Sequence, residues 1–75
     1  MPLIQVKVIE GVFSPEQKRE IAKKLTEAMV SIEGESLRPY TLCIVEEVKS
    51  GDWCLAGNSL TTGDVKALQA GKAKG

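Results

Sequence analysis

Two strand-like segments flank one amphipathic helix in this chain, and this order constrains the fold more than any other feature. Residues Leu3–Ile9 alternate β-branched residues with Gln5 and Lys7, which predicts a half-buried strand. Thr41–Val48 contains a nearly continuous apolar run, which is typical of a strand buried on both faces, as parallel strands are. A strand, a helix and a strand in this order form a βαβ unit, so we expect a parallel pair joined by a right-handed crossover.

The helix between the two strands has clear start and end signals. Ser14 can cap it, Pro15 suits the first helical position, and Gln17 can close a capping box. Gly34 predicts that the helix ends just before it. The apolar residues within it recur at helical spacing and predict one buried stripe: Ile21, Ala22, Leu25, Ala28, Met29 and Ile32.

The C-terminal part contains turn signals on both sides of a short apolar segment. Residues 50–59 predict a hairpin that presents Trp53 and Leu55. Residues 61–64 can open a short terminal helix, and residues 71–75 are expected to be a frayed tail. We therefore predict an α+β fold in a single domain over residues 1–75, with a core of about residues 2–60 and residues 61–75 as a tail or short helix.

A chain of 75 residues can bury only a small core, because ordering each residue costs about 1–2 kcal/mol. Small chains recover this deficit through disulfides, a metal or oligomerisation. We expect no disulfide between Cys43 and Cys54, because no secretory signal precedes them, and no metal site, because the chain has no histidine. Oligomerisation remains, and another subunit's strands are expected to extend the two-stranded sheet.

Charge and hydropathy exclude several classes of partner. Ten basic and ten acidic residues cancel, so we expect no nucleic-acid partner. No apolar run approaches the roughly 20 residues of a membrane helix, so a cytoplasmic protein is expected. Without histidine, a general base working near neutral pH must be a perturbed carboxylate, lysine or cysteine, or the α-amine of the chain itself.

The opening segment carries a resemblance to a known family. Met-Pro-Leu-Ile-Gln-Val-Lys-Val-Ile-Glu-Gly at residues 1–11, followed by Ser-Pro-Glu-Gln-Lys at residues 14–18, resembles the 4-oxalocrotonate tautomerase group of the tautomerase superfamily. Residues 46–53 resemble the segment in which that family places an aromatic wall residue. The resemblance covers about residues 2 to 60 and implies β-α-β subunits that pair into dimers, three of which form a homohexamer.

The resemblance also implies a chemistry. Once Met1 is removed, the secondary amine of Pro2 would act as general base for keto-enol proton transfer on a small 2-oxo acid or enol, without a cofactor. A free α-amine has a pKa of about 7.7–8.0 in model peptides, and partial burial or a nearby cation lowers it further. If Met1 remains, the nitrogen of Pro2 is an amide without useful basicity.

The chain departs from the family at two positions. Members that isomerise dicarboxylates carry an arginine where this chain has Val12, and a second one near Leu42; the nearest arginine here is Arg38. The departures predict a substrate with less negative charge, or a different binding pose. The candidate substrate-binding residues are Arg38 as anion-binding group, Trp53 as wall, and Ile9 and Leu55 as pocket lining. For each of them, packing or solvation is the competing interpretation.

Two other functions remain open. The first is a proline-dependent dehalogenase or hydratase, or a decarboxylase, of a small unsaturated acid, for which Glu47 or Asp52 would have to face Pro2 and activate water. The second is a non-catalytic oligomeric binding protein that keeps the fold, and the departures at Val12 and Leu42 motivate it.

Overall fold

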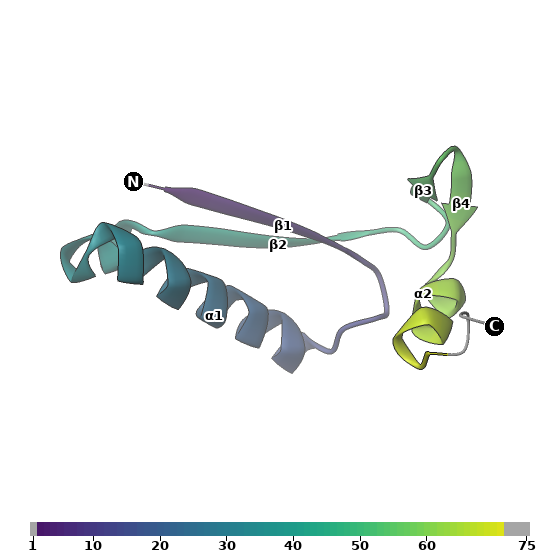
Figure 1. Cartoon of the computed structure of the whole chain (residues 1–75), viewed down its shortest axis with the longest axis horizontal. Helices are drawn as coiled ribbons and strands as arrows, with labels where there is room; N and C mark the ends of the chain where they lie inside the picture. The colour runs from purple at the N-terminus through teal and green to yellow at the C-terminus, as the bar shows by residue number, and fades with distance from the viewer. Residues whose placement is uncertain (1, 72–75) are drawn as a thin grey trace. The chain divides into compact units, whose positions relative to one another are not determined.

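The computed structural model describes residues 2–71, and its elements follow the predicted order. They are β1 (Leu3–Ile9), α1 (Pro15–Glu33), the 3₁₀ helix η1 (Glu35–Tyr40), β2 (Leu42–Val48), β3 (Trp53–Leu55), β4 (Asn58–Leu60) and α2 (Thr62–Gln69) (Figure 1). This β-α-β arrangement with a C-terminal hairpin confirms the predicted α+β fold. Of the predicted tail at residues 71–75, residues 72–75 lie outside the described part, as does Met1.

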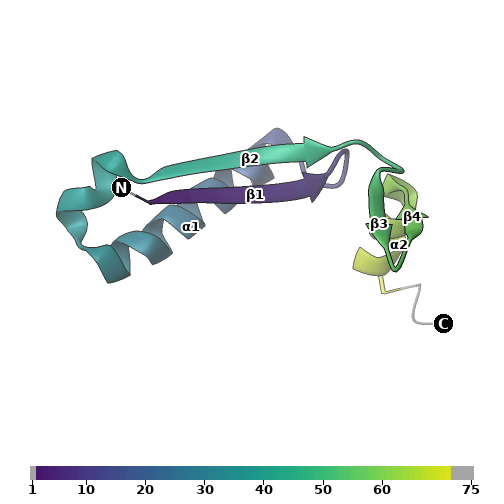
Figure 2. The ribbon, with the colours of Figure 1, turned by 90° about the horizontal axis from the view of Figure 1, so that it is seen from above.

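The two long strands form a parallel pair, as the βαβ order predicts. The N–H of Leu42 donates to the carbonyl of Pro2 over 3.1 Å where both strands begin, and the N–H of Glu10 donates to the carbonyl of Val48 over 2.8 Å where both end. Both arrows point the same way in Figure 2. The described residues form two compact units, each of which contains part of both strands: residues 2–6 with 14–46, and residues 7–13 with 47–71.

Helix α1 belongs to the first unit, and its ends are built as predicted. The hydroxyl of Ser14 accepts from the N–H of Gln17 over 3.1 Å, and the Gln17 side-chain oxygen accepts from the N–H of Ser14 over 2.9 Å, which completes the capping box. At the other end Gly34 takes a φ of 106° and donates its N–H to the carbonyl of Val30 over 2.9 Å. Glycine reaches this positive φ without steric cost, so the helix ends there.

One face of the strand pair is covered by α1, and the opposite face is not (Figures 1 and 2). Alternate residues are half-buried, whereas Leu3, Leu42 and Ile44 on the other face are 52%, 56% and 43% exposed. The prediction that β2 is buried on both faces is therefore wrong for the single chain, because one helix can cover only one side. Among residues 2–71, the buried apolar side chains are Val8, Ile9 and Val30. The predicted buried stripe of α1 is wrong for Leu25 and Ile32, which are 36% and 84% exposed.

An ion cluster connects α1 to η1 within the first unit. Arg38 in η1 donates from Nη1 and Nη2 to the carboxylate of Glu27 in α1, the latter over 3.0 Å. It also donates from Nε and Nη2 to the carboxylate of Glu35, over 2.5 and 3.2 Å. Hydrogen bonds from Arg38 lower the pKa of both carboxyl groups below their ordinary value of 4.5.

The cluster predicts an acid-sensitive contribution to folding. Because the pKa of Glu27 and of Glu35 is lower in the folded chain than in the unfolded chain, their contribution is present above about pH 4.5 and is lost as the pH falls through the folded values. We expect Glu27→Gln and Glu35→Gln to have lower unfolding midpoints than the wild type at pH 6, with the gap closing towards pH 3. Thermal unfolding at equal protein concentration measures this.

Asp52→Asn is the matched control, because it removes a carboxylate outside the cluster. At pH 6 its unfolding midpoint should lie closer to that of the wild type than the midpoints of Glu27→Gln and Glu35→Gln do. A constant gap between Glu27→Gln and the wild type from pH 6 to pH 3 would show that the pairing with Arg38 contributes nothing to folding.

Candidate active site

Pro2, the predicted catalytic residue, lies immediately before β1 in the first unit. Its carbonyl accepts the N–H of Leu42 over 3.1 Å, and its side chain is half-buried. This hydrogen bond ties the residue to the first position of β2. Proline's ring adds a fixed φ, so both the backbone and the ring restrict the direction in which the nitrogen of Pro2 can point.

The second unit contains an open apolar pocket of about 370 Å³, and three of the four predicted substrate-binding residues line it: Ile9, Trp53 and Leu55. Ile9 ends β1, whereas the other two lie in β3. Two residues apart on one strand, Trp53 and Leu55 share a face. Ala56 and Gly57, with φ values of 50° and 80°, form the tight turn that folds β3 back onto β4.

Other residues of this pocket were not among the predicted site residues. Val12 and Phe13 from the loop after β1 line it, so the position at which the resemblance implies an arginine is an apolar part of the wall. Lys7 is the charged member of the lining among the described residues. Helix α2 adds Val65, Leu68 and Gln69; their helical spacing after the capping residue Thr61 is the signal that can find them.

Arg38, the fourth predicted substrate-binding residue, lies in the first unit and is not part of this pocket. A guanidinium has five N–H groups, and four of them donate to Glu27 and Glu35. At most one N–H is left for another acceptor. While both glutamates hold it, Arg38 cannot offer the two-pronged contact with which arginine binds a carboxylate.

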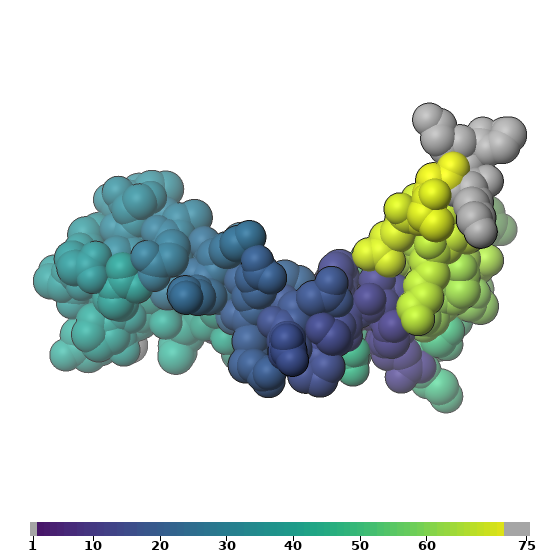
Figure 3. Space-filling model, turned by 90° about the horizontal axis from the view of Figure 1, so that it is seen from below, coloured from purple at the N-terminus to yellow at the C-terminus, as the bar shows by residue number. Residues whose placement is uncertain are grey.

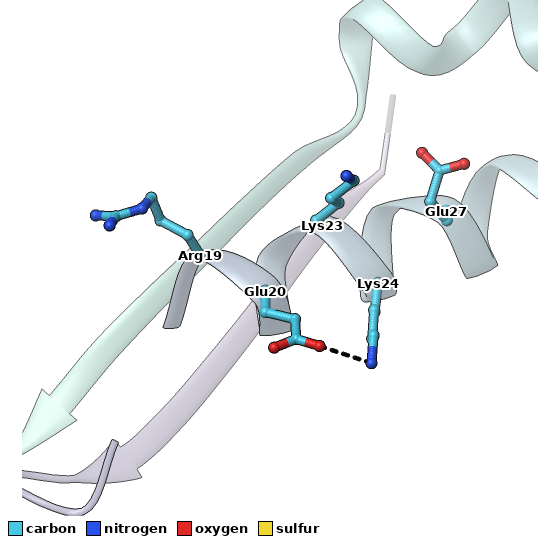
Figure 4. A pocket seen from close by; sticks show the side chains of 5 residues that line it. All are labelled: Arg19, Glu20, Lys23, Lys24 and Glu27. Carbon is cyan, nitrogen blue, oxygen red and sulfur yellow. Dashed lines mark ion pairs between the residues drawn. The ribbon is translucent and has the colours of Figure 1, made fainter. Parts of the chain in front are cut away.

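A second hollow, on the surface of α1, has a different character. It is lined by Arg19, Glu20, Lys23, Lys24 and Glu27 (Figure 4). Glu20 and Lys24 pair across one helical turn over 2.8 Å, and both side chains are mostly exposed. Exposed pairs of this kind stabilise a helix only slightly, so we interpret the hollow as a solvated helix face.

Two further observations concern the described residues as a whole. Within residues 2–71, no cluster of three or more histidine, cysteine, aspartate or glutamate side chains is arranged to hold a metal ion. No helix in this part of the chain combines the length and the apolar character needed to cross a membrane.

Comparison with known proteins gives consistent results. Residues 2–63 match the family model described as tautomerase enzyme. Over 61 residues, the chain is 34% identical to the 2-hydroxymuconate tautomerase of Bacillus subtilis (strain 168), and the match covers 81% of this chain and 95% of that protein.

Solved structures agree with this assignment. TomN, a 4-oxalocrotonate tautomerase homologue of the tomaymycin biosynthetic pathway, superposes with a TM-score of 0.71 at 28% identity, covering 91% of this chain and 95% of that one. YwhB, another such homologue, superposes with a TM-score of 0.68 at 32% identity, covering 84% of this chain and 97% of that one. From its fold and from these matches, the chain belongs to the tautomerase family of enzymes.

Proposed function

We propose that this protein is a cofactor-independent tautomerase in which Pro2, freed by removal of Met1, is the general base. Family membership carries the proposal, because it supports tautomerase activity for a chain whose second residue is proline. The hydrogen bond from Leu42 to the carbonyl of Pro2 supports the role, since it holds the residue at a defined position. A base whose direction is fixed by strand pairing reorganises little during proton transfer.

The proposed reaction converts an enol of a 2-oxo acid into its keto form. The amine of Pro2 accepts the proton of the enol hydroxyl, the electron pair of that O–H bond forms the C=O bond, and the electrons of the C=C bond take up a proton at carbon. The protonated amine supplies the proton at carbon, so the base is regenerated in each turnover. A free α-amine can serve in both directions because its pKa in model peptides, about 7.7–8.0, lies near neutral pH.

The pocket in the second unit supports an apolar substrate with one carboxylate. Trp53, Leu55 and Val12 line it with hydrocarbon surface, and Lys7 is its charged residue. A dicarboxylate such as 2-hydroxymuconate, the substrate named for the Bacillus relative, has a second carboxylate to be bound. This chain has Val12 where the resemblance implies the arginine for it. We therefore propose an enol with an aryl or alkyl group as the substrate, its carboxylate held by Lys7. Arg38 could bind the carboxylate of a substrate only after releasing Glu27 or Glu35.

Assembly is part of the proposal. The face that carries Leu3, Leu42 and Ile44 is apolar and uncovered in the single chain, which favours a dimer-based oligomer, with a hexamer as the proposed form. Pro2 precedes β1 and Ile9 ends it, so we propose that Pro2 of one subunit serves the pocket of another. Cys43 and Cys54 are free thiols, which is compatible with the proposed cytoplasmic location.

Replacing Pro2 tests the chemistry. Pro2→Ala keeps an α-amine after methionine removal but loses the ring that directs it, so we expect kcat/KM for phenylenolpyruvate ketonisation to fall by about 100-fold, at the lower end of the contribution of a positioned base. Pro15→Ala, a second proline-to-alanine change at the start of α1, should keep nearly the wild-type rate.

Intact mass must show that Met1 is absent from all three proteins. Equal rates for wild type and Pro2→Ala would refute the assigned base. Retention of Met1 in protein made by the native host would instead favour a non-catalytic role.

Charging the uncovered sheet face tests the assembly. Ile44→Glu places a carboxylate where an apolar contact between subunits is proposed, so we expect light scattering to give the mass of one subunit and kcat/KM to fall at least about tenfold with the loss of shared sites. Ile32→Glu is the control, because Ile32 on α1 is 84% exposed and lies outside that face. An assembled Ile44→Glu protein with wild-type mass would contradict the proposed interface.

A further inference from the structure

Helix α2 lies almost entirely beyond the part of the chain that the family model matches. The match ends at residue 63, and α2 runs from Thr62 to Gln69. The match to the Bacillus relative covers 95% of that protein but only 81% of this chain. This chain therefore carries a helical segment in addition to the matched region.

The helix is firmly attached within the second unit. The side chains of Thr61 and Asp64 form a reciprocal capping box over 3.2 and 2.9 Å. The hydroxyl of Thr62 donates to the carbonyl of Glu10 over 2.5 Å, and its N–H donates to the hydroxyl of Ser50 over 2.9 Å. In Figure 3 the yellow-green surface of α2 lies beside the purple surface of the segment that contains the end of β1.

The approach of α2 to the loop after β1 depends on Gly11. A Cβ atom at that position would lie 3.1 Å from the Thr62 methyl carbon, and Gly11 has a φ of 81°. A side chain there would thus be strained and crowded against α2 at once. Glycine at this position lets the Thr62 hydroxyl reach the backbone of Glu10.

One face of the attached helix forms a wall of the apolar pocket. Val65, Leu68 and Gln69 line it, and the spacing of three and four residues places them on the same side of α2. Leu68 is 53% exposed, so it has contact surface that the fold of the single chain does not use. The pocket volume of about 370 Å³ is in the range of sites for small molecules.

We propose that α2 is a specificity element, whose Val65–Leu68–Gln69 face contacts the group that the substrate carries on the enol carbon that takes up the proton. This inference rests on the proposed function, since it takes the pocket of the second unit as the substrate site. The face selects an aryl or branched alkyl group of the 2-oxo acid by hydrophobic contact, with the Gln69 amide at its border. Contacts of this kind discriminate between substrates that differ only in apolar size.

Two substrates that differ at one group test the role of α2. Phenylenolpyruvate and the enol of 2-oxobutanoate share the carboxylate and the enol, but the second carries a methyl group in place of the phenyl ring. We expect Leu68→Ala to lower kcat/KM for phenylenolpyruvate by about tenfold and for the methyl analogue by less than about twofold. Lys66→Ala, an exposed position on α2 outside the pocket lining, should leave both values unchanged.

Three outcomes would overturn the inference: an equal loss for both substrates in Leu68→Ala, no loss for either, or a change of oligomeric mass in Leu68→Ala but not in Lys66→Ala. The last would make α2 a contact between copies of the chain.

A binding measurement separates this inference from the proposed function. Trp53 is the single tryptophan of the chain and lines the pocket, so its fluorescence reports occupancy without turnover. Phenylpyruvate should bind Leu68→Ala about tenfold more weakly than wild type or Lys66→Ala. If Pro2→Ala is as active as wild type while this difference holds, the assigned base fails and the role of α2 stands. Equal binding to all three proteins overturns the role of α2 alone.

Discussion

The uncovered face of the β1–β2 pair is the constraint on which the rest of this structure depends. A parallel pair of strands has two faces, and a chain of this length supplies one long helix, which covers one of them. On the other face, the side chains of Leu3, Leu42 and Ile44 stay in water. The fold therefore forgoes about 25 cal/mol of stabilisation for each Å² of apolar surface that remains exposed there. The buried core of the single chain is correspondingly thin.

The sequence predicts the elements of this fold well because the signals are local. Ser14, Gln17 and Gly34 act within one turn of their own helix ends, and the alternation in β1 is a property of seven consecutive residues. The burial of β2 was predicted less well. An apolar run indicates only that a strand can be buried on both faces. Whether helices or strands pack on both faces depends on the whole chain and on any further copies of it.

The candidate site also has parts that local sequence patterns predict and parts that depend on long-range contacts. Ile9, Trp53 and Leu55 line one pocket because strand ends and hairpin faces follow from local pattern, while their binding of a substrate stays a prediction. Two features depend on long-range contacts that no local pattern reveals. The guanidinium of Arg38 is engaged by Glu27, eleven residues earlier, and the pocket receives a wall from α2 at the far end of the chain. The engagement of Arg38 and the wall from α2 both favour Lys7 and the apolar surface around Trp53, rather than Arg38, as the groups that contact a substrate in this pocket.

The way α2 is attached has a consequence for how such proteins diverge. Its anchors are the hydroxyl and N–H of Thr62, which meet Glu10 and Ser50, whereas the side chains of Val65 and Leu68 take no part in them. Mutation can therefore alter those two side chains without loosening the helix and without touching the strand that begins after Pro2. If the Val65–Leu68–Gln69 face contacts substrate as proposed, side-chain changes on it alter which substrate fits while the backbone anchors of α2 stay in place.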